Sequence, residues 1–188
     1  MQRFRALALL ALLLLPAVGC APGATSYVRD DVDFSYIRRV AVFPFQNLAQ
    51  DVHAGSRTYS IFLAELLEQD GLVAVEPGEV MSAIRELRLN TGGPLDQQQV
   101  VDLGRALRAD AIFFGTIEDY GLDSTERDRV YMITASFSLA ETETGSNIWS
   151  SQVHETGSSF LRKLFGGGSV SMYHVTRAAV RDALESLF

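Results

Sequence analysis

The sequence feature that most constrains the fold is a short apolar run near the middle of the chain. Ala111-Ile112-Phe113-Phe114-Gly115 contains no polar residue, which is typical of a β-strand that is covered on both faces. We therefore place this strand at the centre of a sheet, with helices packed against it.

Further strands and helices alternate around this central strand. Val40 to Phe43 continue a strand that starts at Arg39 and that Pro44 closes, because proline cannot donate a ladder hydrogen bond. Asp96 and Gln99 form the sequence of a capping box, which predicts a helix ending near Ala109. The other predicted elements are a helix over 57–69 with Ser56 as N-cap and Gly71 as stop, a strand over 72–75, a helix opened by Pro77-Gly78, a hairpin of 130–139 and 148–153 across Thr144-Gly145, and a final helix over 172–187.

The predicted order is β-α-β-α-α-β-β-β-α. Two crossover units followed by a meander predict an α/β fold, with a single mixed β-sheet flanked by helices. One domain over residues 37–188 accounts for all of these elements.

The start of the chain has the pattern of a secretory signal that ends at the only cysteine. Arg3 and Arg5 precede an unbroken Ala/Leu run over 6–15, and small residues stand directly before Cys20. This resembles a bacterial lipobox, although Ala17 stands where leucine is usual. The resemblance implies removal of 1–19, diacylglycerol and N-acyl lipid on Cys20, and, because Ala21 rather than aspartate follows, anchoring to the outer membrane with the domain in the periplasm. The alternative is an ordinary cleaved signal with a chance cysteine.

Residues 20–36 have no periodic apolar face and contain three aspartates, so we expect a flexible tether after the lipidated cysteine. The sixteen residues after Cys20, at about 3.5 Å each, would reach roughly 55 Å. The domain would therefore stay close to its membrane.

The charge balance and the ionisable residues argue against several classes of function. The chain carries a net charge of −7, which disfavours nucleic acid as a partner. His53, His154 and His174 have no spacing typical of metal ligands, and Glu118-Asp119 is interpreted as a solvated loop entrance. No nucleophile or nucleotide-binding motif is evident. We expect no catalytic, cofactor or metal site and no small-molecule substrate, and we do not expect an enzyme.

One segment combines large apolar side chains with cations and precedes a run of three glycines. It consists of Phe160, Leu161, Arg162, Lys163, Leu164 and Phe165. This composition is typical of an element that contacts a membrane or a protein partner. The alternative is that its apolar side chains pack beneath the final helix. Trp149 is expected in the core, and Asn47 is expected to cap a loop.

Three stretches together resemble the superfamily that includes the curli secretion-channel lipoprotein CsgG, the N-terminal domain of TolB and the peptidoglycan-synthase activator LpoB. These stretches are Val40 to Asn47, Ala109 to Tyr120, and Leu139 to Ser150 with its Thr144-Gly145 turn. The resemblance covers most of residues 37–188. It implies a periplasmic domain that binds other proteins or itself and does not catalyse a reaction.

Differences from those relatives narrow the expected role. Asp119 to Arg129 is too polar and short to form one of the membrane hairpins of a curli-type pore. A 55 Å tether is short for an activator that reaches through the cell wall. We therefore expect an adaptor or oligomeric subunit of a secretion or surface-assembly apparatus. The alternative is a regulator of a peptidoglycan synthase or of a Tol-like complex.

Overall fold

The computed structural model describes residues 25–29, 33–123, 130–157 and 171–188. In this part the chain forms one sheet of seven strands with four α-helices and one short 3-10 helix, which confirms the predicted α/β fold. The strands are β1 (Thr25–Val28), β2 (Arg39–Val42), β3 (Gln46–Asn47), β4 (Val73–Ala74), β5 (Ala111–Asp123), β6 (Val130–Glu141) and β7 (Asn147–Thr156). The helices are η1 (Phe34–Tyr36), α2 (Ala54–Leu67), α3 (Pro77–Glu86), α4 (Gln97–Leu107) and α6 (Met172–Glu185).

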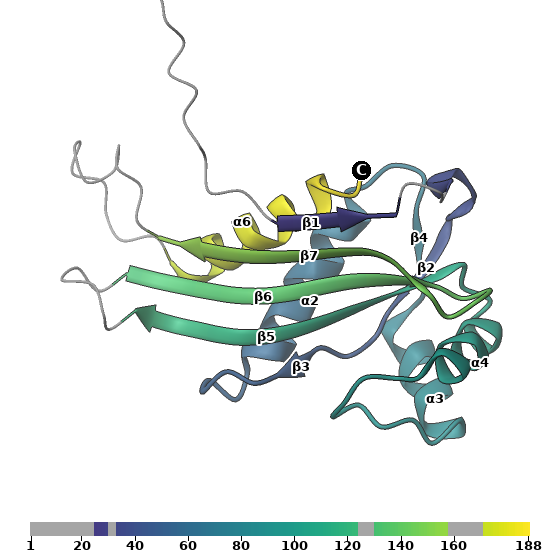
Figure 1. Ribbon diagram of the computed structural model, residues 1–188. Helices are drawn as coiled ribbons and strands as arrows, with labels where there is room; N and C mark the ends of the chain where they lie inside the picture. Colours follow the sequence, from purple (N-terminus) through teal and green to yellow (C-terminus); the bar gives the residue numbers. More distant parts are fainter. Residues whose placement is uncertain (1–24, 30–32, 124–129, 158–170) are drawn as a thin grey trace, which may run out of the picture.

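The sheet is mixed, with the strand order β1-β7-β6-β5-β2-β4. In the series β1, β7, β6 and β5 each strand is antiparallel to its neighbour, whereas β2 is parallel to both β5 and β4. β3 continues beyond β2 and pairs in parallel with β5. The long strands β5 and β6 project past the helices at one end of the sheet (Figure 1). We call this the hairpin end; it comprises residues 120–123, 130–133 and 154–157.

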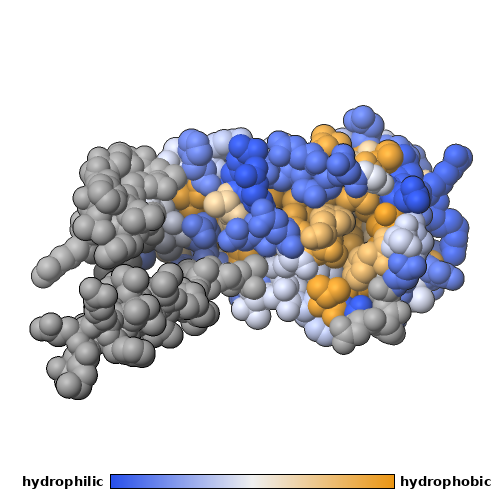
Figure 2. Space-filling model, turned by 90° about the horizontal axis from the view of Figure 1, so that it is seen from above, coloured by the Kyte–Doolittle hydropathy of each residue, from blue (hydrophilic) through white to orange (hydrophobic). Residues whose placement is uncertain are grey.

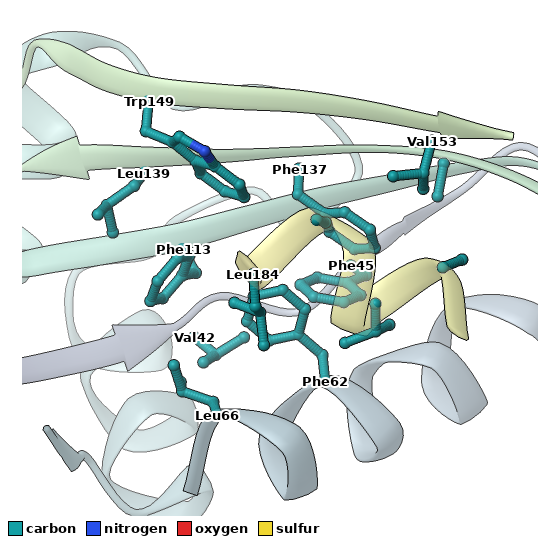
Figure 3. Close-up of a cluster of buried hydrophobic side chains, with 14 of the residues drawn as sticks. Val42, Phe45, Phe62, Leu66, Phe113, Phe137, Leu139, Trp149, Val153 and Leu184 are labelled. Atoms are coloured by element: carbon teal, nitrogen blue, oxygen red, sulfur yellow. The ribbon is translucent and has the colours of Figure 1, made fainter. Parts of the chain in front are cut away.

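Helices cover the two faces of the sheet unequally (Figure 1). α2 and α6 pack along one face over the larger core cluster, in which Phe62, Phe113, Phe137 and Trp149 are fully buried (Figure 3). α3 and α4 cover only one part of the opposite face, over a smaller core cluster that includes Phe43. The rest of that second face, which we call the open face, carries no helix of the described chain. Trp149 is thus a core residue, as the sequence predicts.

Local sequence signals account for the ends of several helices. Both hydrogen bonds of the predicted capping box are present: Gln99 N–H donates to the Asp96 carboxylate, and Asp96 N–H donates to the Gln99 side chain. Pro77 stands in the first turn of α3, where its missing N–H costs nothing. The prediction for α2 is wrong at its start, because His53 is the N-cap and Ser56 lies inside the helix. There Ser56 donates its hydroxyl to the His53 carbonyl.

A buried carboxylate joins the two helices of the larger core. Glu65 on α2 is 4% exposed and accepts hydrogen bonds from the guanidinium groups of Arg177 and Arg181 on α6. Burial opposes the charge of Glu65, but the two guanidinium groups outweigh that effect and hold its pKa below the usual range. The cluster fixes how α6 lies against α2.

Two described elements lie within residues 20–36, where the sequence predicts a flexible tether. Thr25–Val28 forms β1, an edge strand paired with β7, and Phe34–Tyr36 forms η1. The expectation of a tether is therefore wrong at these residues. The reason is tertiary: TSYV has no apolar alternation of its own and gains its ladder hydrogen bonds from the exposed edge of β7.

Candidate interaction site

The residues singled out from the sequence as contact sites lie outside the described residues. These are Cys20 and the segment Phe160, Leu161, Arg162, Lys163, Leu164 and Phe165, which remain predictions. Their described neighbours along the chain are Thr25, Gly157 and Ser171. The candidate site is therefore built from the part of the sheet to which these neighbours belong.

Gly157 belongs to the hairpin end, Ser171 precedes α6, and Thr25 starts β1, which runs away from the hairpin end. Thr25, the first residue of β1, pairs with Gln152 in the middle of β7, and Gly157 N–H donates to the Tyr131 carbonyl. The indole N–H of Trp149, near the start of β7, donates to Ser186 just after α6, so α6 runs antiparallel to β7 and begins near the hairpin end (Figure 1). Of the described neighbours, Gly157 and Ser171 thus lie at or near the hairpin end, and Thr25 lies beside the middle of β7.

The hairpin end also carries an open cavity of about 660 Å³. Its lining combines the carboxylates of Glu118, Asp119 and Asp123 with the apolar side chains of Leu48 and Leu122, which are 61% and 48% exposed. An acidic surface with exposed apolar side chains is suited to contact with another protein.

A β-bulge places two of these carboxylates on the same face. The register of β5 against β6 shifts between Ile117 and Asp119, so Glu118 is the extra residue. Glu118 accepts a hydrogen bond of 2.5 Å from Ser136, and Asp119 pairs with Thr134, which is likewise on the open face. The pair Glu118-Asp119 therefore lies within a strand. Its interpretation as a loop entrance is wrong, because periodicity cannot reveal a bulge.

The three histidines lie apart from one another. His53 caps α2, while the Nδ1 of His154 lies 3.0 Å from the Thr134 hydroxyl and that of His174 lies 2.7 Å from the Ser171 hydroxyl. Within the described ranges, no group of three or more histidine, cysteine, aspartate or glutamate side chains could hold a metal ion. No helix in the same ranges is both long and apolar enough to cross a bilayer.

One carboxylate near the hairpin end has a raised pKa. Burial raises the pKa of Glu155, the charge of Asp182 on α6 adds to this, and His154 opposes it. A carboxylate whose pKa is raised on folding weakens the folded state at a pH above that pKa.

We expect Glu155→Gln to raise the free energy of unfolding at neutral pH. The gain should shrink as the pH falls through the pKa of Glu155, because the wild-type carboxyl group then becomes neutral in the folded protein. Urea denaturation of both proteins between about pH 4 and pH 8 measures this. A gain that stays constant across this range would show that the charge of Glu155 is not its cause.

The outer edges of the sheet are a second surface that the sequence does not reveal. In the described part of the chain, β1 and β4 are the two edge strands. Tyr27 on β1 is 56% exposed and Val73 on β4 is 57% exposed. Seen from the side of β1 and α6, an apolar area lies among hydrophilic residues over the half of the molecule that holds the C-terminus (Figure 2). Both edges thus offer unpaired backbone groups beside apolar side chains.

Comparison with known proteins identifies the fold. No protein-family model and no curated protein sequence matches the chain. Among solved structures, the chain is similar to the PelC dodecamer from Paraburkholderia phytofirmans, with a TM-score of 0.60 and 18% identity over 87% of this chain and 97% of that chain. It is also similar to lipoprotein GNA1162 from Neisseria meningitidis, with a TM-score of 0.57 and 17% identity over 79% and 99% of the two chains.

A third similarity is to the C-terminal domain of LpoB from Salmonella enterica. Its TM-score is 0.51, at 14% identity over 67% of this chain and 86% of that domain. The expected resemblance to the LpoB-containing superfamily is therefore confirmed for the fold. The chain has the fold of these three proteins.

Proposed function

We propose that this protein is a non-enzymatic, outer-membrane-anchored lipoprotein whose periplasmic domain is an adaptor or oligomeric subunit of a secretion or surface-assembly apparatus. The observation that carries the proposal is the similarity to the PelC dodecamer, which extends over 97% of that chain. A fold shared over this length contains counterparts of nearly every element of a subunit that forms a dodecamer.

The geometry of β1 gives the proposed anchor a short reach. Only residues 21–24 separate Cys20 from Thr25 at the start of β1. Five Cα-to-Cα steps at about 3.5 Å each span roughly 17 Å, in place of the 55 Å expected for an unstructured tether. A lipid on Cys20 would therefore hold the β1 edge of the sheet close to the membrane.

The two edges of the sheet support self-association. A ring requires a heterologous interface, in which one patch of a subunit meets a different patch of the next. β1 and β4 are different strands at opposite edges, and each presents an exposed apolar side chain, Tyr27 and Val73. These edges could meet between neighbouring copies.

The proposal is tested by a photo-crosslinking residue placed at Tyr27 or at Phe165 in living cells. We expect Tyr27 to link to residues near Val73 of a second copy, and mass spectrometry of the linked peptides identifies them. A crosslinker at Met81, which is 39% exposed on α3, is the control and should yield no specific adduct. Phe165 tests whether the segment 160–165 contacts a partner.

The same cells provide a control for the anchor. Cys20→Ala should move the protein from the membrane fraction to the soluble periplasmic fraction and weaken the links from Tyr27, because two-dimensional confinement is lost. A monomer with no specific link from either position would overturn the proposed assembly role.

The second candidate function is regulation of a peptidoglycan synthase or of a Tol-like complex. It is favoured by the similarity to the LpoB C-terminal domain. The 17 Å reach argues against it, because a partner in the inner membrane lies beyond that distance. Specific links from Phe165 to a synthase, without self-links from Tyr27, would establish this alternative.

A further inference from the structure

The open face holds a second cavity, which the proposed function does not use. It has a volume of about 300 Å³ and lies between the sheet and the loop that joins α3 to α4. This is at the lower end of the range of roughly 300–1,000 Å³ that is typical of small-molecule sites. The lining comes from four segments, 43–46, 91–100, 114–116 and 138–147.

One wall of this cavity is apolar. The rings of Phe43 and Phe114 pack at a centroid distance of 5.5 Å, and Leu95 and Val100 continue the same surface from the α3–α4 loop and α4. Phe43 is nearly fully buried, whereas Phe114 is only partly buried. The face of Phe114 and the neighbouring aliphatic groups can therefore pack against an apolar surface of a ligand.

The other wall carries uncharged polar groups that are free to bind a ligand. In the described part of the chain, the hydroxyls of Thr116 and Ser138 and the amide of Asn147 make no hydrogen bond to protein. The only fully buried side-chain polar atoms without a partner in that part are on Thr58 and Ser151, so the hydroxyls of Thr116 and Ser138 reach solvent. Gln46 donates to the Gly92 carbonyl and keeps its own amide oxygen available.

Every residue that lines the cavity is uncharged at neutral pH. This contrasts with a chain in which 21% of residues are charged, and with the acidic cavity at the hairpin end. A charged ligand would lose its hydration and gain no ion pair here. The lining therefore selects for a neutral ligand that has an apolar face and hydrogen-bonding edges.

The position of the cavity within the topology points to a ligand site independently of its lining. Phe43 and Gln46 follow the carboxyl end of β2, which is parallel to its neighbours β4 and β5. The chain leaves β2 for α2 on one face and leaves β4 for α3 on the other. In open α/β sheets, ligands bind beyond the carboxyl ends of strands at such a reversal.

We propose that this cavity binds a neutral saccharide unit. A pyranose ring has C–H faces that pack on Phe114 and hydroxyls around its edge that can pair with Thr116, Ser138 and Asn147. An extended peptide is less suited, because beside the cavity β5 is paired with β6 on one side and with β2 and β3 on the other, so a peptide could not add there as a further strand. The inference is independent of the proposed assembly role.

The test is an NMR titration of the isotopically labelled mature chain with cellobiose and maltose as neutral probes. We expect the NMR signals of Thr116, Ser138 and Asn147 to shift in a saturable way. The Kd for each sugar should be about 1 mM. Glucuronate and glucosamine, which are charged, should shift these signals at least several-fold less at equal concentration. Absence of saturable shifts with both neutral sugars would overturn the proposal.

A matched pair of variants locates the binding. Ser138→Leu fills the cavity and should abolish the shifts, whereas Ser150→Leu makes the same change at the residue paired with Ser138 on β7, outside the cavity. Asn147→Ala should weaken binding without filling space. Shifts that persist in Ser138→Leu would contradict the proposed site. If the shifts saturate with an uncharged apolar tripeptide and with neither sugar, the proposal is wrong and the cavity binds a protein partner instead.

Discussion

Phe62→Ala is expected to lower the free energy of unfolding by about 3–5 kcal/mol. Phe62 is fully buried on α2, and its ring lies 5.2–5.3 Å from those of Phe45, Phe113 and Phe137 (Figure 3). Removing the ring of Phe62 leaves a cavity between α2 and the three segments that carry these phenylalanines. For a domain of this size the melting temperature should fall by roughly 10 °C.

The same substitution at an exposed phenylalanine is the control. Phe188 is 55% exposed at the end of the chain, so Phe188→Ala should change the free energy of unfolding by no more than about 0.5 kcal/mol. Chemical denaturation of the three proteins gives the comparison. Equal effects of the two substitutions would show that the aromatic cluster around Phe62 does not hold α2 on the sheet.

Elements with a local signal are the ones that the sequence predicts well. The capping box of Asp96 and Gln99, Pro77 in the first turn of α3, and the apolar run at Ala111 each depend on residues that are neighbours in the chain. Asn47 also caps its loop as expected: its side chain accepts from Ala49 N–H and donates to the Asp51 carbonyl. Their energetics need little information from the rest of the fold.

Elements that depend on partners distant in the sequence cannot be predicted from local patterns. β1 exists because β7 has a free edge, and β5 extends to Asp123 because β6 pairs with it along its whole length. Leu67, the last residue of α2, is 67% exposed, which its apolar side chain alone does not indicate. Local pattern sets the type of each element, while tertiary pairing sets its length and its outward face.

The candidate sites show the same division. Cys20 and the segment 160–165 stand out because their unusual composition is contiguous in the sequence. The uncharged cavity does not, because Phe43, Phe114, Ser138 and Asn147 are ordinary residues at their own positions and meet only in the fold. No single-sequence motif could have indicated that cavity.

The turn that carries one rim of this cavity leads to the second large prediction. Gly145 connects β6 to β7 with φ at +72°, and an added Cβ would lie 2.4 Å from the backbone oxygen of Gln97 in the first turn of α4. Gly145→Ala therefore combines an unfavourable left-handed backbone conformation with a clash against backbone that cannot turn aside. We expect a loss of about 2–5 kcal/mol in the free energy of unfolding.

A second glycine separates the two causes. Gly71 has a similar φ of +86°, but nothing lies within 4 Å of a Cβ placed there. Gly71→Ala should cost only about 1 kcal/mol, the backbone contribution alone. The excess for Gly145→Ala measures the contact between the β6–β7 turn and α4. If that contact also holds the rim of the cavity, Gly145→Ala should shift the NMR signal of Asn147 while Gly71→Ala leaves it in place. Equal costs for the two variants would show that the turn moves freely away from α4.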